Sequence, residues 1–184
     1  MLILGSGSEA REDLLKKVGL TPHRVVPADI NEQQKQHEKP LEYVKRMAAE
    51  KAEAINISRG QVLITADTIV LVGRKILHKT DDINEAKTNL KTLSGRRHKV
   101  ITAFCVKNGD NIKAETAKTI LKMKNLSDNE LENYISLNEW KGKAGSYSIQ
   151  GRAITFFPFI SGCFSNVIGL PLPKLFVALR SMGF

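Results

Sequence analysis

Short apolar runs and amphipathic stretches alternate along the chain, and their spacing predicts its secondary structure. Brief apolar runs predict strands at residues 2–4, 24–26, 62–66, 69–72 and 75–77. Apolar residues at helical spacing predict helices at residues 9–18, from 40 to just past 55, and at 82–95, 127–137 and 173–182. Because helices and strands alternate, we expect an α/β protein.

The second half of the chain carries a hairpin signal. Residues 100–106 and 112–123 predict two strands joined at Asn108-Gly109, a dipeptide that favours a tight turn. Further short strands are expected within residues 146–164. Since a hairpin is antiparallel, the sheet is predicted to be mixed and twisted, with helices flanking it.

Buried faces or caps are predicted for three of the helices. Ala10, Leu14 and Val18 form the apolar stripe of the first helix. Ile83, Ala86, Leu90 and Leu93 form that of the third. The pairs Asp82/Glu85 and Ser127/Glu130 have the spacing of capping boxes at the starts of two helices.

Composition narrows the class of protein. A chain of 184 residues suits one domain, 1–184, with a sizeable core or two closely joined lobes. The net charge is +9, but the basic residues are scattered and aromatic residues make up only 6%, so no nucleic-acid partner is expected. Cys105 and Cys163 are far apart and suggest neither a disulfide nor a zinc site.

Nothing in the chain looks like a targeting or membrane segment. The apolar run at the N-terminus is short and lacks a basic region before it, unlike a signal peptide. No stretch approaches the roughly 20 apolar residues needed to span a bilayer. We therefore expect a cytoplasmic protein.

The first candidate site is the small-residue loop Gly5-Ser6-Gly7-Ser8 between a strand and a helix. Unpaired amides at the start of a helix attract anions, and Ser8 and Arg11 add donors suited to phosphate oxygens. The alternative is that Ser8 only caps the helix and Arg11 is solvated. The loop is not a Walker motif.

Three further residues stand out by their surroundings. Asp67 lies between two apolar runs, where a carboxylate needs a partner, a metal or a task, unless it marks a bend in the strand. Lys51 interrupts an apolar helical face, so it either reaches an anion or extends to solvent. Gln150, in a glycine-bounded segment, is either a base reader or a loop residue. Together these groups suit phosphoryl chemistry.

In their order along the chain, these motifs resemble the Maf family of nucleotide pyrophosphatases. The matching segments are Leu4-Gly5-Ser6-Gly7-Ser8 with Arg11, Leu14-Leu15, Asp29-Ile30-Asn31-Glu32, Glu50-Lys51-Ala52, Ala66-Asp67-Thr68-Ile69-Val70, Leu77-His78-Lys79, Leu93-Ser94-Gly95 with His98, Lys143-Ala144-Gly145, Ile149-Gln150-Gly151 and Gly169-Leu170-Pro171-Leu172. The resemblance covers nearly the whole chain. It implies a Maf/ITPase-like fold with two lobes around a central cleft, commonly as a homodimer, and hydrolysis of nucleoside triphosphates to a monophosphate and pyrophosphate.

The resemblance also implies roles for single residues. Asp67 matches the catalytic acid, and Glu32 matches a cleft acid that shares a divalent metal, Mg²⁺ or Mn²⁺, with Asp67. The phosphate-binding positions match Ser8, Arg11, Lys51 and Lys79. Gln150 matches the glutamine of the dTTP/UTP branch. Since a carboxylate is a weak base at neutral pH, we expect Asp67 to act with a metal and a water that attacks the α phosphorus.

The sequence departs from the family pattern in three places. The serine loop continues as Glu9-Ala10-Arg11 where the family has a proline and two arginines, so one arginine is lost and one acid is gained. The usual Lys-Pro is Lys79-Thr80, and the stretch after Gly151 differs. The first change leaves open a non-catalytic nucleotide-binding regulator of cell division, in keeping with the link between Maf proteins and septum formation. An enzyme for modified nucleotides also stays open.

Overall fold

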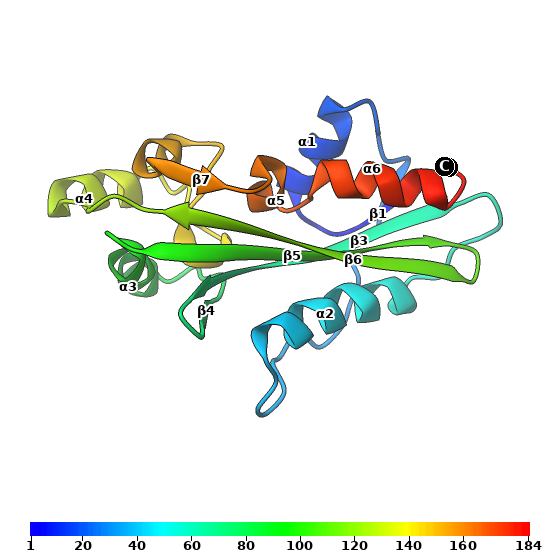
Figure 1. Ribbon diagram of the computed structural model, residues 1–184, viewed down its shortest axis with the longest axis horizontal. Coiled ribbons are helices and arrows are strands. Elements are labelled where there is room, and N and C mark those ends of the chain that lie inside the picture. The colour runs from blue at the N-terminus through cyan, green and yellow to red at the C-terminus, as the bar shows by residue number, and fades with distance from the viewer.

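The computed structural model describes residues 1–184 as one sheet with helices on both faces (Figure 1). The strands are β1 (Leu2–Gly5), β2 (Arg24–Val25), β3 (Val62–Val72), β4 (Lys75–Leu77), β5 (Arg97–Asn108), β6 (Asn111–Lys122) and β7 (Phe159–Ser161). The α-helices are α1 (Glu9–Lys17), α2 (Pro40–Ala54), α3 (Ile83–Leu93), α4 (Asp128–Ser136), α5 (Phe164–Ile168) and α6 (Leu172–Ser181), with 3₁₀ helices η1 (Ala144–Ser146) and η2 (Arg152–Phe156). None of the helices combines the length and apolar character needed to span a membrane.

The sheet is mixed, as the sequence predicted. Its strands lie in the order β2-β1-β3-β5-β6-β7, and β4 pairs with β3 beside this path. The pairs β1–β2 and β1–β3 are parallel. All other pairs are antiparallel, including the predicted hairpin of β5 and β6.

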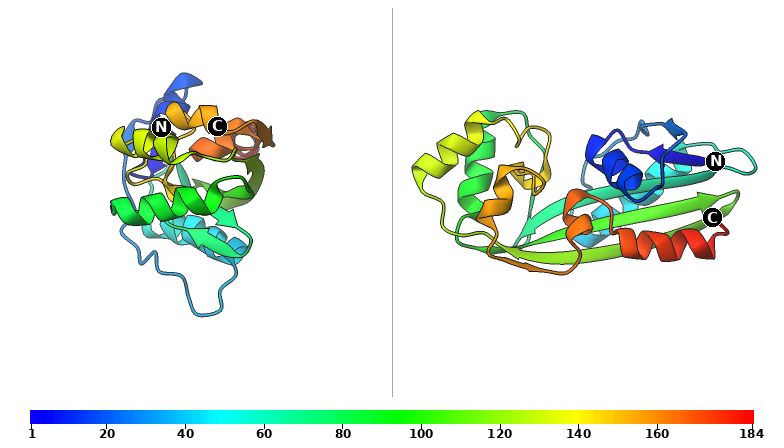
Figure 2. Two further views of the ribbon diagram at one scale, coloured as in Figure 1. Left: turned by 90° about the vertical axis from the view of Figure 1, so that its left-hand side faces the viewer. Right: turned by 90° about the horizontal axis from the view of Figure 1, so that it is seen from above.

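Two groups of elements gather at opposite ends of the long strands. One end carries β1, α1 and α6 on one face of the sheet and α2 on the other, while α3, α4 and β7 gather at the far end (Figure 2). Each end has its own apolar core, one around Trp140 and Tyr134 and one around Leu15 and Phe104. The α/β architecture with two ends joined by long strands agrees with the expected Maf/ITPase-like fold.

Two expectations about strands are corrected by the structure. Residues 62–66 and 69–72 belong to one continuous strand, β3, instead of two. Within residues 146–164 only β7 is a strand, because this stretch folds into η2 and turns before α5 begins at Phe164. At the start of the stretch, Gly145 and Ser146 have φ of +70° and +58°, and this left-handed backbone cannot extend a strand.

The predicted apolar stripes are partly wrong. Val18 and Ile83 are exposed, and on α1 the buried residues are Arg11, Leu14 and Leu15. An apolar stripe is read from helix geometry alone, but neighbouring elements decide which face is covered.

The helix caps agree with the sequence more closely. Asp82 caps α3 by accepting from the amides of Asn84 and Glu85, but Glu85 bonds the Thr80 hydroxyl, so the reciprocal box does not form. The Ser127/Glu130 capping box of α4 is confirmed.

Candidate active site

A gap along one edge of β3 positions the site. On this edge β1 pairs with β3 only as far as Gly5 opposite Thr65, and β4 begins pairing at Val70 opposite Leu77. The other edge of β3 is paired with β5 throughout this stretch. Residues 66–69 therefore have a free edge where the loop after β1 leaves the sheet. Ligands bind at such places, beyond the carboxyl ends of parallel strands.

Asp67 lies in the middle of β3, within this gap. It stands opposite Ala103 of β5 in regular register, so it does not mark a bend. Alternate residues of a strand point to opposite faces, so Asp67 shares the α2 face with Ile69, and Thr68 points to the other face. Asp67 is 8% exposed, and a carboxylate so far from water needs a partner.

Lys51 of α2 is that partner. Its Nζ atom lies 2.8 Å from Oδ1 of Asp67 and 2.8 Å from Oε1 of Glu32. Lys51 is itself only 8% exposed, because the apolar face of α2 packs on the sheet around it. The interruption in the apolar stripe is therefore a buried cation that joins two carboxylates, and it does not extend to solvent.

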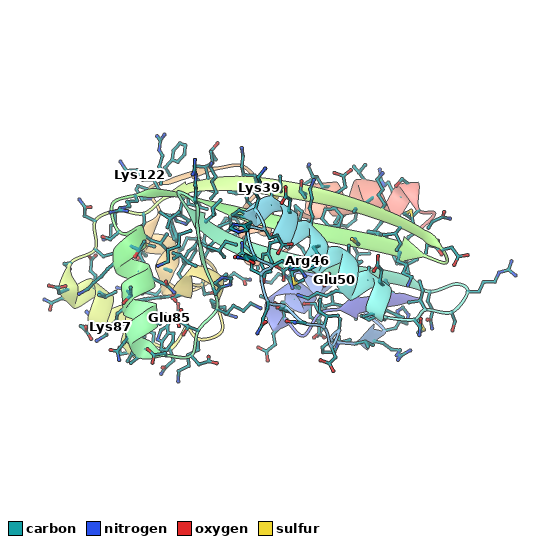
Figure 3. The ribbon with its side chains drawn as sticks, turned by 90° about the horizontal axis from the view of Figure 1, so that it is seen from below. Lys39, Arg46, Glu50, Glu85, Lys87 and Lys122 are labelled. Carbon is teal, nitrogen blue, oxygen red and sulfur yellow. The ribbon has the colours of Figure 1, made fainter.

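The segment that carries Glu32 is fastened to α2. The Tyr43 hydroxyl donates to the backbone carbonyl of Glu32 at 2.9 Å. Arg46 donates to the Glu38 carboxylate and to the carbonyl of Gln33. Figure 3 shows Arg46 on α2. The Glu32 side chain is thus held beside Lys51 although it is half exposed.

The electrostatic setting lowers the pKa of Glu32. Partial burial by itself raises the pKa of a carboxyl group. Here the hydrogen bond and charge of Lys51, with the charges of Lys79 and Arg11, outweigh that effect. Glu32 is therefore ionised at neutral pH and available as an oxygen ligand.

Glu32 and Asp67 can together hold a divalent metal only in company with other ligands. Each uses one carboxylate oxygen to bond Lys51, which leaves its second oxygen free. The structure has no cluster of three or more acidic, histidine or cysteine side chains placed to hold a metal ion. Mg²⁺ commonly takes one or two carboxylates and completes its shell with waters and substrate phosphates. The two residues fit a metal that arrives with a phosphorylated ligand.

Arg11 is buried and bonded within the protein. Its Nη1 donates to the Ser6 hydroxyl at 2.8 Å, Nη2 to the Thr68 hydroxyl at 3.0 Å, and Nε to the carbonyl of Gly169 at 3.0 Å. Burial lowers the pKa of Arg11, although the charges of Asp67 and Glu32 act against this. Arg11 is thus not solvated, and it joins the loop after β1, the centre of β3 and the segment after α5.

Ser8 stands at the N-cap position of α1, but its side chain makes no capping hydrogen bond. Its amide bonds the Ser6 hydroxyl instead. The simple capping role is therefore absent, and the hydroxyl of Ser8 is free to meet a ligand.

Three adjoining hollows form one cleft, and Lys79 borders all of them. The cationic channel is lined by Gly5, Ser6, Gly7, Ser8, Glu9, Arg11, Pro27, Ala28, Glu32, Lys51, Lys79, Lys141, Gly142 and Lys143. The acidic pocket includes Glu32, Tyr43, Asp67, Thr68 and His78. The apolar pocket includes Ala10, Val70, Tyr147, Ile149, Gln150, Val167 and Ile168.

Lys79 lies at the junction of the three hollows. Desolvation by the walls of the cleft lowers the pKa of Lys79, and the charge of Arg11 adds to the effect, although the side chain is still exposed to solvent. No carboxylate lies within 4.0 Å of its Nζ atom. The structure thus brings every predicted site residue to one cleft, with Gln150 in its apolar part.

Some residues of the cleft were not predicted as site residues. Thr68 bonds Arg11 and Thr102, and only its place beside Asp67 in the sequence could have indicated it. Tyr147 forms a wall of the apolar pocket, and its hydroxyl lies 2.9 Å from Nε2 of the buried His98. Lys141 was missed because a lysine in a polar loop looks like an ordinary surface residue.

The mixed sheet and the cleft at its open strand edge define an α/β protein with a Maf-like fold and a cationic cleft. The chain belongs to the Maf family, since the family model described as Maf-like protein matches residues 1–182.

Relatives of known name match over almost the whole chain. It is 46% identical to the dTTP/UTP pyrophosphatase of Cereibacter sphaeroides, over 99% of this chain and 95% of that protein. The dTTP/UTP pyrophosphatase of Zymomonas mobilis is 46% identical, over 100% and 92% of the two chains. The nucleoside triphosphate pyrophosphatase of Rickettsia akari is 43% identical, over 100% and 94%.

Proposed function

We propose that this chain is a nucleoside triphosphate pyrophosphatase, which cleaves between the α and β phosphates to give a nucleoside monophosphate and pyrophosphate. The observation that carries the proposal is the convergence of Asp67, Lys51, Glu32 and Arg11 on one cleft from four distant segments. Whole-chain relatives named for this activity support it.

The acidic, basic and neutral residues of the cleft have different proposed roles. Asp67 orients the attacking water towards the α phosphorus, because its second carboxylate oxygen is not bonded to Lys51. Lys79 and the remaining N–H groups of Arg11 stabilise the charge that develops on the phosphate oxygens. The free hydroxyl of Ser8 and the first amides of α1 bind the phosphates.

A divalent cation, Mg²⁺ or Mn²⁺, completes the proposed site. Glu32 and Asp67 would hold it through oxygen atoms, the ligands that both ions favour. Bound there with the substrate, the ion would neutralise phosphate charge and make a coordinated water more acidic.

We propose that the apolar pocket receives the base, with dTTP or UTP preferred. Gln150 offers both a donor and an acceptor, which matches the N3–H and carbonyl edge of uracil and thymine. Guanine exposes a similar pair, so the walls of the pocket must contribute to the choice. The names of the bacterial relatives support this preference.

The test is pyrophosphate release by the purified chain with canonical and modified triphosphates, with and without Mg²⁺ or Mn²⁺. We expect metal-dependent release with dTTP and UTP at the head of the ranking. Asp67→Asn should keep its fold but lower turnover by about 10²-fold or more, because loss of a positioned acid–base group typically costs that much. Binding of a triphosphate without turnover by the wild-type chain would instead favour the regulator.

A further inference from the structure

A short loop after α4 places two more lysines in the cationic channel. Lys141 and Lys143 both line it, on either side of Gly142. Neither has a carboxylate within 4.0 Å of its Nζ atom, whereas Lys51 is bonded to two. Unpaired ammonium groups along a channel are available to an anion.

The loop is anchored, so the side chains of its two lysines extend from a fixed backbone. Trp140 is 1% exposed, and its indole N–H donates to the carbonyl of Ile135 at 2.9 Å. The amide of Gly142 donates to the carbonyl of Thr80, next to Lys79, at 3.2 Å. Gly142 has φ of +62°, which turns the chain sharply between the two lysines.

Glu139, the acidic residue nearest to Lys141 in the sequence, bonds a different group. The Glu139 carboxylate accepts the amide of Arg152 at 2.8 Å, beside Gly151. The Nζ atom of Lys141 lies over the Trp140 ring, 5.9 Å from its centroid. Lys141 lines a channel whose walls hold five basic residues and two acidic ones.

The two lysines occupy different positions along the cleft. Lys143 borders both the apolar pocket and the cationic channel, so it stands where the base end meets the phosphate end. Lys141 borders only the channel, with the loop Gly5–Ser8. With the base in the apolar pocket, the phosphates farther from the nucleoside would extend into the channel that Lys141 lines.

We propose that Lys141 binds the terminal phosphates of the substrate, the part that leaves as pyrophosphate, and that Lys143 binds nearer the α phosphate. This assignment rests on the proposed function for the direction of the nucleotide. It makes Lys141 a residue that distinguishes a triphosphate from the monophosphate product.

The test measures the binding of pyrophosphate and of UMP separately, by calorimetric titration of the purified full chain in the presence of Mg²⁺. For Lys141→Ala we expect pyrophosphate to bind about tenfold more weakly, a loss of about 1.4 kcal/mol, because one solvent-screened charge contact is removed. UMP should bind within twofold of wild type, because it carries no terminal phosphates. Lys143→Ala should weaken both ligands. Lys141→Arg should restore most of the pyrophosphate affinity, because it keeps the charge.

The matched control is Lys122→Ala. Lys122 is exposed, has no ion pair and ends β6 away from the lining of the cleft, as labelled in Figure 3. It should leave both affinities unchanged. Pyrophosphate affinity within twofold of wild type in Lys141→Ala would overturn the assignment, as would equal weakening of both ligands. Because titration needs no turnover, failure of the proposed activity would appear separately, as a wild-type chain that releases no pyrophosphate.

Discussion

Replacing Arg11 by lysine separates the charge of this residue from its hydrogen-bonding geometry. The guanidinium donates to three acceptors from three segments, Ser6, Thr68 and the carbonyl of Gly169, at 2.8, 3.0 and 3.0 Å. A lysine ammonium keeps the positive charge, but from a single nitrogen it cannot follow the planar fork to all three. We expect at most one of the three bonds to survive in Arg11→Lys.

The magnitude follows from the two acceptors left behind. Leaving a buried polar group unsatisfied costs about 1–3 kcal/mol, so two of them cost about 2–6 kcal/mol before any rehydration. Since hydroxyls can turn towards water in the cleft, the lower half of that range is expected. In a domain of this size 1 kcal/mol shifts the melting temperature by about 2–4 °C, so a loss of about 2–4 kcal/mol should lower Tm by roughly 4–16 °C.

The assay is thermal and urea unfolding of Arg11→Lys beside Arg180→Lys, a control on an exposed residue of α6. Pyrophosphate release should fall by more than the loss of folded protein accounts for. The reason is that Arg11 also holds Gly169, which is next to Ile168 in the wall of the apolar pocket. If Arg11→Lys melted within about 2 °C of wild type and kept its turnover, the charge alone would suffice and the bridging role would be wrong.

Three further predictions concern the ion pairs, the base and the effect of pH. Lys51→Met should lower turnover by about 10²-fold and the unfolding free energy by about 1–3 kcal/mol, because the Asp67 and Glu32 oxygens lose their shared donor; wild-type values in both assays would contradict it. Gln150→Glu should lower kcat/KM for dTTP and UTP about tenfold relative to GTP, since a carboxylate cannot donate to a base carbonyl; an unchanged ranking in a competition assay would exclude base contact. Burial lowers the pKa of His98 from 6.5 to about 4, so the unfolded chain takes up this proton first as the pH falls. The free energy of unfolding is therefore unaffected by His98 above about pH 6.5, and it falls by up to about 3 kcal/mol as the pH approaches 4. In urea unfolding, His98→Gln should lose less stability than wild type between pH 7 and 5.

Local patterns predicted most of the secondary structure. The first turn of a helix and the tight turn of a hairpin depend on a few adjacent residues, so the caps Asp82 and Ser127 and the hairpin of β5 and β6 were correctly predicted. The two turn residues are Gly109 and Asp110, one position later than expected, because Asn108 still pairs with Asn111. The continuity of β3 could not be predicted in this way. A carboxylate in mid-strand looks like an interruption until its partner is known, and Lys51 is 16 residues away in the sequence.

The candidate site could be predicted as a set of residues but not as an arrangement. The order of the motifs predicted Arg11 as a phosphate ligand, because an arginine that follows a serine-rich loop is well placed to bind phosphate. Its burial depends on the Gly169 carbonyl, which is 158 residues distant. Lys141 gave no signal because only the fold around Trp140 shows that the loop points into the channel.

Lys51 explains how two carboxylates can stand ready for a cation in a cleft before any ligand is bound. Ionised Glu32 and Asp67 would repel one another if they shared this cleft alone, and burial would favour protonating one of them. The ammonium between them removes that tendency while occupying only Oε1 and Oδ1. The second oxygens make no bond to Lys51, and both residues line the acidic pocket together with Lys79. An internal lysine thus holds both acids in place in the free protein and keeps Glu32 ionised, as the proposed metal-assisted reaction would need.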